Sequence, residues 1–135
     1  MRRAVGLLIV LIAAASCQTP ESAVQPLPPN AQPLSYQELL NRTKAQVAAA
    51  QEFFYRDSWR EVEQAALSLQ QSAELLGKVK PEDLPPRQRD QSTRLAKQVQ
   101  EAAVALGESA RAHDVLKTTQ AFQSLNLTIR EMRAE

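Results

Sequence analysis

Few side chains in this sequence could do chemistry. The 135 residues include one cysteine, Cys17, and one histidine, His113, and the only methionine besides Met1 is Met132. A metal site needs several converging His, Cys, Asp or Glu side chains, and the Glu-x-x-His pairs that hold di-iron centres in helical bundles do not occur. The sequence therefore predicts no metal and no bound cofactor.

Catalytic and nucleic-acid-binding patterns are missing as well. His113 and Asp114 are adjacent, and no serine has the flanking glycines of a nucleophile turn. Three scattered glycines cannot form a phosphate-binding loop. The formal charge is +1, and without Arg2 and Arg3 the 16 basic residues become 14 against 15 acidic ones, so no basic face is available for nucleic acid. We expect neither an enzyme nor a nucleic-acid-binding protein.

The first residues are typical of an export signal. Arg2 and Arg3 precede an apolar run over residues 4–15, which is shorter than the ~20 residues a membrane-spanning helix needs. The run ends in Ala14-Ala15-Ser16-Cys17, which resembles the lipobox of bacterial lipoproteins. The resemblance implies removal of residues 1–16, lipidation of Cys17 and anchoring to membrane lipid in the cell envelope, facing the periplasm. In that family Gln18, rather than Asp, after the cysteine favours the outer membrane.

An ordinary secretory signal is the alternative. In that case residues 13–15 are a small-residue cleavage site and Cys17 is an incidental thiol. The position of the single cysteine directly after the small residues favours the lipoprotein.

Residues 17–34 form the predicted linker after the anchor. Five prolines lie between residues 20 and 33, and because proline lacks an amide donor and has a fixed φ, this stretch cannot be helical. We expect a disordered tether whose residues 18–34 span up to ~50 Å at ~3.1 Å each.

The remainder, residues 35–135, predicts an all-α domain. Ala, Leu, Gln, Glu, Lys and Arg dominate it, and apolar residues recur at alternating steps of three and four. Four stripes follow this pattern: Tyr36-Leu40-Thr43-Val47-Ala50-Phe54, Trp59-Val62-Ala66-Leu69-Ala73-Leu76, Leu95-Val99-Ala102-Leu106 and Val115-Thr118-Phe122-Leu125-Ile129-Met132.

Capping signals set the predicted helix limits at about 36–56, 59–76, 87–112 and 115–133. Ser35 with Glu38, and Ser58 with Glu61, fit capping boxes. Gly77 is placed to cap the second helix, and Asp114 to begin the fourth.

Four such stripes joined by short turns and one longer loop predict an antiparallel up-down-up-down four-helix bundle. Its core should include Val62, Leu69, Phe122, Leu125 and Ile129. A long coiled-coil hairpin is the alternative architecture.

The helical domain also resembles four-helix cytochromes of the c-prime type, through Trp59 near the start of the second helix and Phe122 within the last. In that family the last helix carries CxxCH, which binds haem covalently. Residues 125–130 contain neither cysteine nor histidine, so covalent haem is excluded there. Non-covalent haem would have to use His113 or Met132 as ligands, although a helix-junction role for His113 and a core role for Met132 are the simpler interpretations.

These observations lead to one expected function and one alternative. We expect a non-enzymatic lipid-anchored envelope protein whose bundle binds or spaces an unknown envelope protein partner, with homo-oligomerisation through alanine-rich faces as a further option. The alternative is a carrier of haem or an apolar small molecule, of degenerate cytochrome c-prime type.

Overall fold

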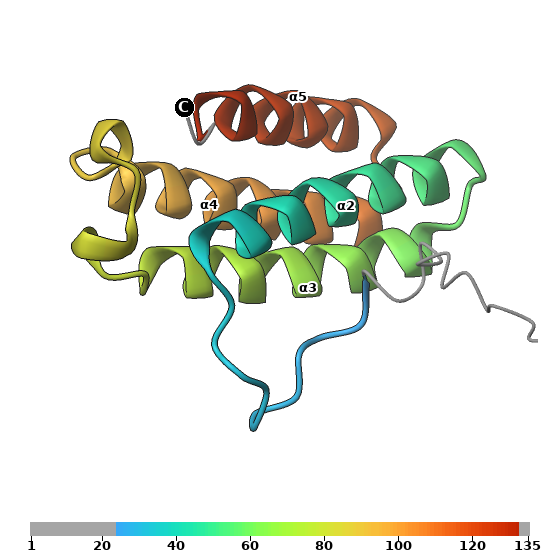
Figure 1. Ribbon diagram of the computed structural model, residues 1–135. Coiled ribbons are helices and arrows are strands. Elements are labelled where there is room, and N and C mark those ends of the chain that lie inside the picture. The colour runs from blue at the N-terminus through green and yellow to red at the C-terminus, as the bar shows by residue number, and fades with distance from the viewer. Residues whose placement is uncertain (1–23, 133–135) are drawn as a thin grey trace, which may run out of the picture.

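The computed structural model describes residues 24–132, and its regular elements are all helices (Figure 1). Its elements are the α-helices α2 (Tyr36–Tyr55), α3 (Trp59–Gly77), α4 (Ser92–Arg111) and α5 (Val115–Glu131), with two short 3₁₀ turns, η1 (Pro81–Asp83) and η2 (Pro86–Gln88), between α3 and α4. No strand occurs among these residues. The predicted all-α four-helix bundle is confirmed.

Consecutive helices run antiparallel and pack side by side, so that α3 lies against both α2 and α4, and α5 lies against α4 (Figure 1). Helices α2 and α5 approach each other less closely along their lengths. They are joined near both ends, where the Phe54 and Phe122 rings lie 5.6 Å apart and the Tyr36 hydroxyl donates a 2.8 Å hydrogen bond to the Met132 carbonyl.

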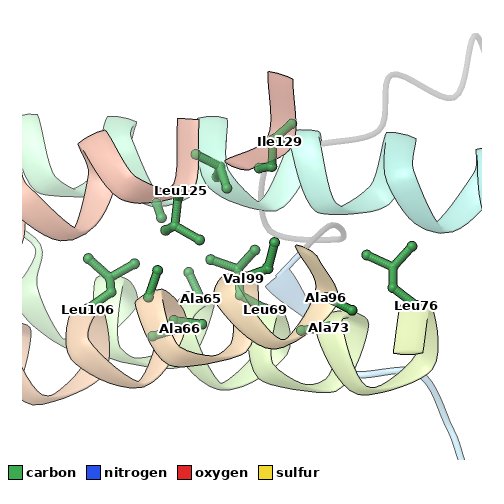
Figure 2. Packing of buried hydrophobic residues seen from close by; sticks show 14 of the residues in the cluster. Ala65, Ala66, Leu69, Ala73, Leu76, Ala96, Val99, Leu106, Leu125 and Ile129 are labelled. Atoms are coloured by element: carbon green, nitrogen blue, oxygen red, sulfur yellow. The ribbon is translucent and has the colours of Figure 1, made fainter. Parts of the chain in front are cut away.

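The core follows the predicted stripes (Figure 2). All five residues expected in the core are buried, with Val62, Leu69 and Leu125 fully so. Alanines let α3 and α4 approach closely, and a Cβ added to Gly107 would lie 3.4 Å from the Ala66 Cβ. Close packing of this kind supplies stability that isolated helices of three to five turns lack.

The two predicted capping boxes have different outcomes. At Ser35 the box is complete, because its hydroxyl accepts from the Glu38 amide and its own amide donates to the Glu38 carboxylate over 2.7 Å. The Ser58 side chain makes no cap bond, so that prediction was wrong. Ser58 N–H is already bonded to the Phe53 carbonyl, and its ψ of 69° differs from the extended 163° at Ser35, which turns its hydroxyl away from the α3 amides.

The third helix begins later than predicted, at Ser92 rather than residue 87. Pro85 and Pro86 precede η2, and the buried Gln88 side chain donates a 3.0 Å bond to the Glu131 carbonyl at the end of α5. The chain must therefore turn again after residue 88 before a helix can start. The last helix ends at Glu131, two residues before the predicted limit of 133, which itself lies outside the described residues, and the other predicted limits agree with the structure within one residue.

Gly77 and Val115 also differ from expectation. Gly77 is the last residue of α3 and keeps a negative φ, while Lys78 follows as the cap. Val115, expected on the buried stripe, is 59% exposed because the first turn of α5 lies at the end of the bundle.

Candidate functional site

Of the predicted site residues, Cys17 lies outside the described residues, and His113 and Met132 lie far apart. His113 precedes α5, and Met132 follows it. The helix has 17 residues, so at ~1.5 Å per residue it separates the two by about 25 Å. They cannot both ligate one haem iron.

His113 has a structural role in the turn between α4 and α5. Its φ of 53° is left-handed, and its N–H bonds to the Ala110 carbonyl while the Asp114 N–H bonds to the Ser109 carbonyl. These two bonds make a Schellman-type helix end. The imidazole stacks on the Trp59 indole with 5.0 Å between ring centres and 10° between planes.

The turn between α2 and α3 repeats this arrangement. Asp57 has a φ of 57°, its N–H bonds to the Phe54 carbonyl, and the Ser58 N–H bonds to the Phe53 carbonyl. Both turns lie at the same end of the bundle, and the contact between Trp59 and His113 joins them. We call this end, with residues 54–60 and 111–117, the turn end.

The turn end carries exposed apolar side chains above a layer of rings. Tyr55 is 80% exposed, Leu116 68% and Val115 59%. Beneath them, Phe54 contacts Trp59 edge-on with ring centres 5.5 Å apart. The sequence pattern placed Phe54 on the core stripe but gave no reason to expect this exposed group.

The second feature is the docking of residues 24–34, which we call the proline-rich segment. It was predicted as part of a free tether, but Val24 is buried and its carbonyl accepts from the Ser68 hydroxyl. The Gln71 side-chain amide bonds to both backbone groups of Leu27, accepting from the N–H at 2.8 Å and donating to the carbonyl at 3.1 Å. The Gln25 carbonyl accepts from the Arg42 guanidinium. The segment turns at residues 28–31, where the Ala31 N–H bonds to the Pro28 carbonyl, and residues 28–33 are exposed. Val24, Leu27 and Leu34 nevertheless hold both of its ends against the bundle.

A cleft of about 1030 Å³ opens between the proline-rich segment and the bundle. Its apolar walls include Leu27, Leu39 and Val79, and its charged lining residues are Glu38, Lys78, Lys80 and Asp83. This mixture suits an extended peptide that carries both apolar and charged side chains.

No known protein family, curated protein sequence or solved structure matches this chain.

Two buried groups have shifted pKa values that reflect packing. Burial raises the pKa of Tyr36, whose hydroxyl is held by the Met132 carbonyl, and burial lowers the pKa of Arg42 beneath the proline-rich segment. Backbone and hydroxyl donation from Ser35 lowers the pKa of Glu38. Each shift is explained by a helix end or by segment docking.

Among residues 24–132, no three His, Cys, Asp or Glu side chains are grouped so that they could hold a metal ion. In the same range no helix has the length and apolar character to cross a bilayer. The arrangement offers surfaces for contact: the exposed turn end, and the cleft beside the proline-rich segment.

Proposed function

We propose that this protein is a non-enzymatic, lipid-anchored protein of the cell envelope, whose helical bundle serves as an interaction or spacer module. The observation that carries the proposal is the order of features along the chain: a lipobox-like Ala14-Ala15-Ser16-Cys17, a proline-rich stretch, then a bundle whose single histidine is stacked on Trp59.

Docking of the proline-rich segment shortens the tether. Only seven residue steps separate Cys17 from Val24, which at ~3.3–3.6 Å per step reach about 25 Å, roughly half the length of a free tether over residues 18–34. A lipid on Cys17 would hold the bundle close to the membrane surface, on the periplasmic side.

The partner is best sought at the cleft beside the proline-rich segment. Its walls combine apolar residues with basic and acidic ones, which favours an envelope protein that presents an extended chain of mixed apolar and charged side chains. Pairing of two copies through outward alanines of α4 and α5 is a further option.

Metabolic labelling tests the anchor. Labelled palmitate should enter the wild-type protein and should be absent from Cys17→Ser, because this is the only thiol in the chain. An unlabelled wild type would remove the anchor from the proposal.

The haem-carrier alternative has less support, because its two ligand candidates lie at opposite ends of α5. It is tested by titrating purified protein with haemin. A sharp Soret band that is lost in His113→Ala or Met132→Ala would favour the carrier.

A further inference from the structure

We propose that the turn end is a membrane-contact surface, on which Tyr55, Val115 and Leu116 lie in the headgroup region of the bilayer that holds the lipidated Cys17. This inference rests on the proposed anchor and adds an orientation for the bundle and a chemical partner for one of its surfaces.

The first observation is the type of residue exposed. Tyr55 and Leu116 are each more than two-thirds exposed and Val115 nearly so, and the half-buried Trp59 lies beside them. Tyrosine and tryptophan are favoured at membrane interfaces because an apolar ring and a polar tip match the two sides of that boundary. The composition of this end therefore fits the headgroup region of a bilayer.

The second observation is the path of the chain. Leu34 lines the cleft with Leu75 and Val79 near the end of α3, and Leu27 is bonded to Gln71. From Leu34 towards the N-terminus, the contacts that the proline-rich segment makes with α3 move towards the first residues of that helix.

Val24, the first described residue, continues this path. It is bonded to Ser68, and it lines a smaller hollow with Phe53 and Glu61. Val24 therefore lies against the half of α3 that is nearer the turn end.

The distances are compatible with simultaneous contact. Ser68 is nine residues from Trp59, which is ~14 Å along α3. Cys17 reaches about 25 Å from Val24. An anchor in the membrane therefore allows the turn end to touch the same surface.

The two ends of the bundle differ in the charge that they expose, and this difference favours the turn end as the membrane-contact surface. At the turn end, Arg111 pairs with Glu63 at 3.0 Å and Arg56 pairs with Glu52, while the exposed Arg60 and Lys117 have no ion-pair partner among the described residues, so the apolar side chains are accompanied by two basic groups. The opposite end exposes an alternation of charges in the α3–α4 connection: Lys78, Lys80, Glu82, Asp83, Arg87, Arg89 and Asp90. That end has no comparable apolar group.

Such a small patch binds lipid weakly alone. The anchor changes this, because a tethered surface meets the bilayer at a high effective concentration. Contact should therefore depend on the anchor, and on zwitterionic lipid it should change little with salt, because such a surface has no net charge to attract Arg60 or Lys117.

Quenching of Trp59, the only tryptophan in the chain, provides the test. Protein purified from membranes is reconstituted into phosphatidylcholine–phosphatidylethanolamine vesicles whose acyl chains are brominated near the headgroup, and the mass of the Cys17 peptide is measured in parallel. We expect about a twofold loss of Trp59 emission, and a clearly smaller loss when Val115→Gln and Leu116→Gln are combined. The matched control is Leu127→Gln, which changes a 60% exposed leucine further along α5 and should behave as wild type.

The possible outcomes distinguish the proposed lipid anchor on Cys17 from the proposed membrane contact of the turn end. If the Cys17 peptide carries no lipid, the natural anchor is refuted. Coupling the Cys17 thiol to a maleimide lipid then supplies an artificial anchor, so that Trp59 quenching still tests the turn end. Equal quenching in wild type and double variant, or none in either, overturns membrane contact even if Cys17 is lipidated. A dimer in sedimentation that the double variant abolishes, together with unquenched Trp59, shows instead that the turn end pairs two copies. Both the double variant and Leu127→Gln should keep the wild-type circular dichroism and unfolding temperature, because the substituted side chains are exposed.

Discussion

The turn end and the opposite end, which we call the loop end, close the bundle by different means. At the turn end, residues 56–58 and 112–114 reverse the chain through short-range backbone bonds and the Asp114 cap, and rings from α2, α3 and α5 pack beneath the two turns. At the loop end, residues 78–91 cover the core with the buried Leu84, and long-range bonds from Tyr36 and Gln88 hold the last turn of α5. The comparison teaches that a tight reversal leaves apolar side chains exposed, whereas a long connection can cover them and present charge.

The largest expected effect is at the ring cluster beneath the turn end, where Phe122 of α5 packs on Phe54. Phe122→Ala removes a 5% exposed side chain that contacts Phe54, and we expect a loss of about 3–5 kcal/mol in the free energy of unfolding. Chemical denaturation with circular dichroism measures it. The exposed Leu127→Ala should change the same quantity by less than ~0.5 kcal/mol. If the two losses were equal, the ring layer would not be the contact that closes this end.

A smaller effect is expected at the loop end. Tyr36→Phe removes the hydroxyl that bonds to Met132, which should cost about 1 kcal/mol at neutral pH. Tyr55→Phe at the turn end is the matched control, and because Tyr55 is 80% exposed it should cost almost nothing.

The stability difference between the wild type and Tyr36→Phe should depend on pH in a direction set by the pKa of Tyr36. Burial raises the pKa of Tyr36 above 10.0, so the folded protein keeps a proton that the unfolded chain releases first. The stabilisation is complete below pH 10 and is lost as pH rises through the folded-state pKa. Unfolding curves of wild type and Tyr36→Phe should converge at high pH. A constant separation would show that the hydroxyl is not buried as described.

The smallest expected effects come from introducing a glycine at the turn end and replacing a glycine at the loop end. Asp57→Gly relieves a left-handed φ at the turn end and should raise the free energy of unfolding by roughly 0.5–1 kcal/mol, whereas Asp57→Ala should not. Gly77→Ala should give a similar gain of roughly 0.5–1 kcal/mol, because Gly77 is helical and its added Cβ would lie 3.7 Å from the Ala96 Cβ. Thermal unfolding compares the three variants. If Gly77→Ala destabilises the protein instead, Gly77 must have a left-handed φ, which would contradict its helical conformation.

Patterns local to one helix predicted most of the fold. Alternating steps of three and four identified the buried face of each helix, and Ser35 and Asp114 were correctly identified as caps. These features depend on residues within a few positions of each other, so the sequence contains the necessary information.

The features that were missed depend on contacts between distant residues. Leu27 and Gln71 are 44 positions apart, and nothing in the spacing of either signals their pairing. The late start of α4 depends on the bond from Gln88 to Glu131, and the failed cap at Ser58 depends on the bond that ends α2. The exposed group at the turn end arises from how two turns are placed together, which no single helix pattern specifies.

The two bonds between Gln71 and Leu27 make it possible to measure how often the proline-rich segment leaves the bundle. Because one side chain satisfies both backbone groups of Leu27, release of the segment exposes that amide proton to solvent while the helices stay folded. The hydrogen-exchange rate of this single amide therefore counts openings of the proline-rich segment, and, compared with the rates of amides inside α3, it reports how often the bundle would be free to extend away from the proposed anchor.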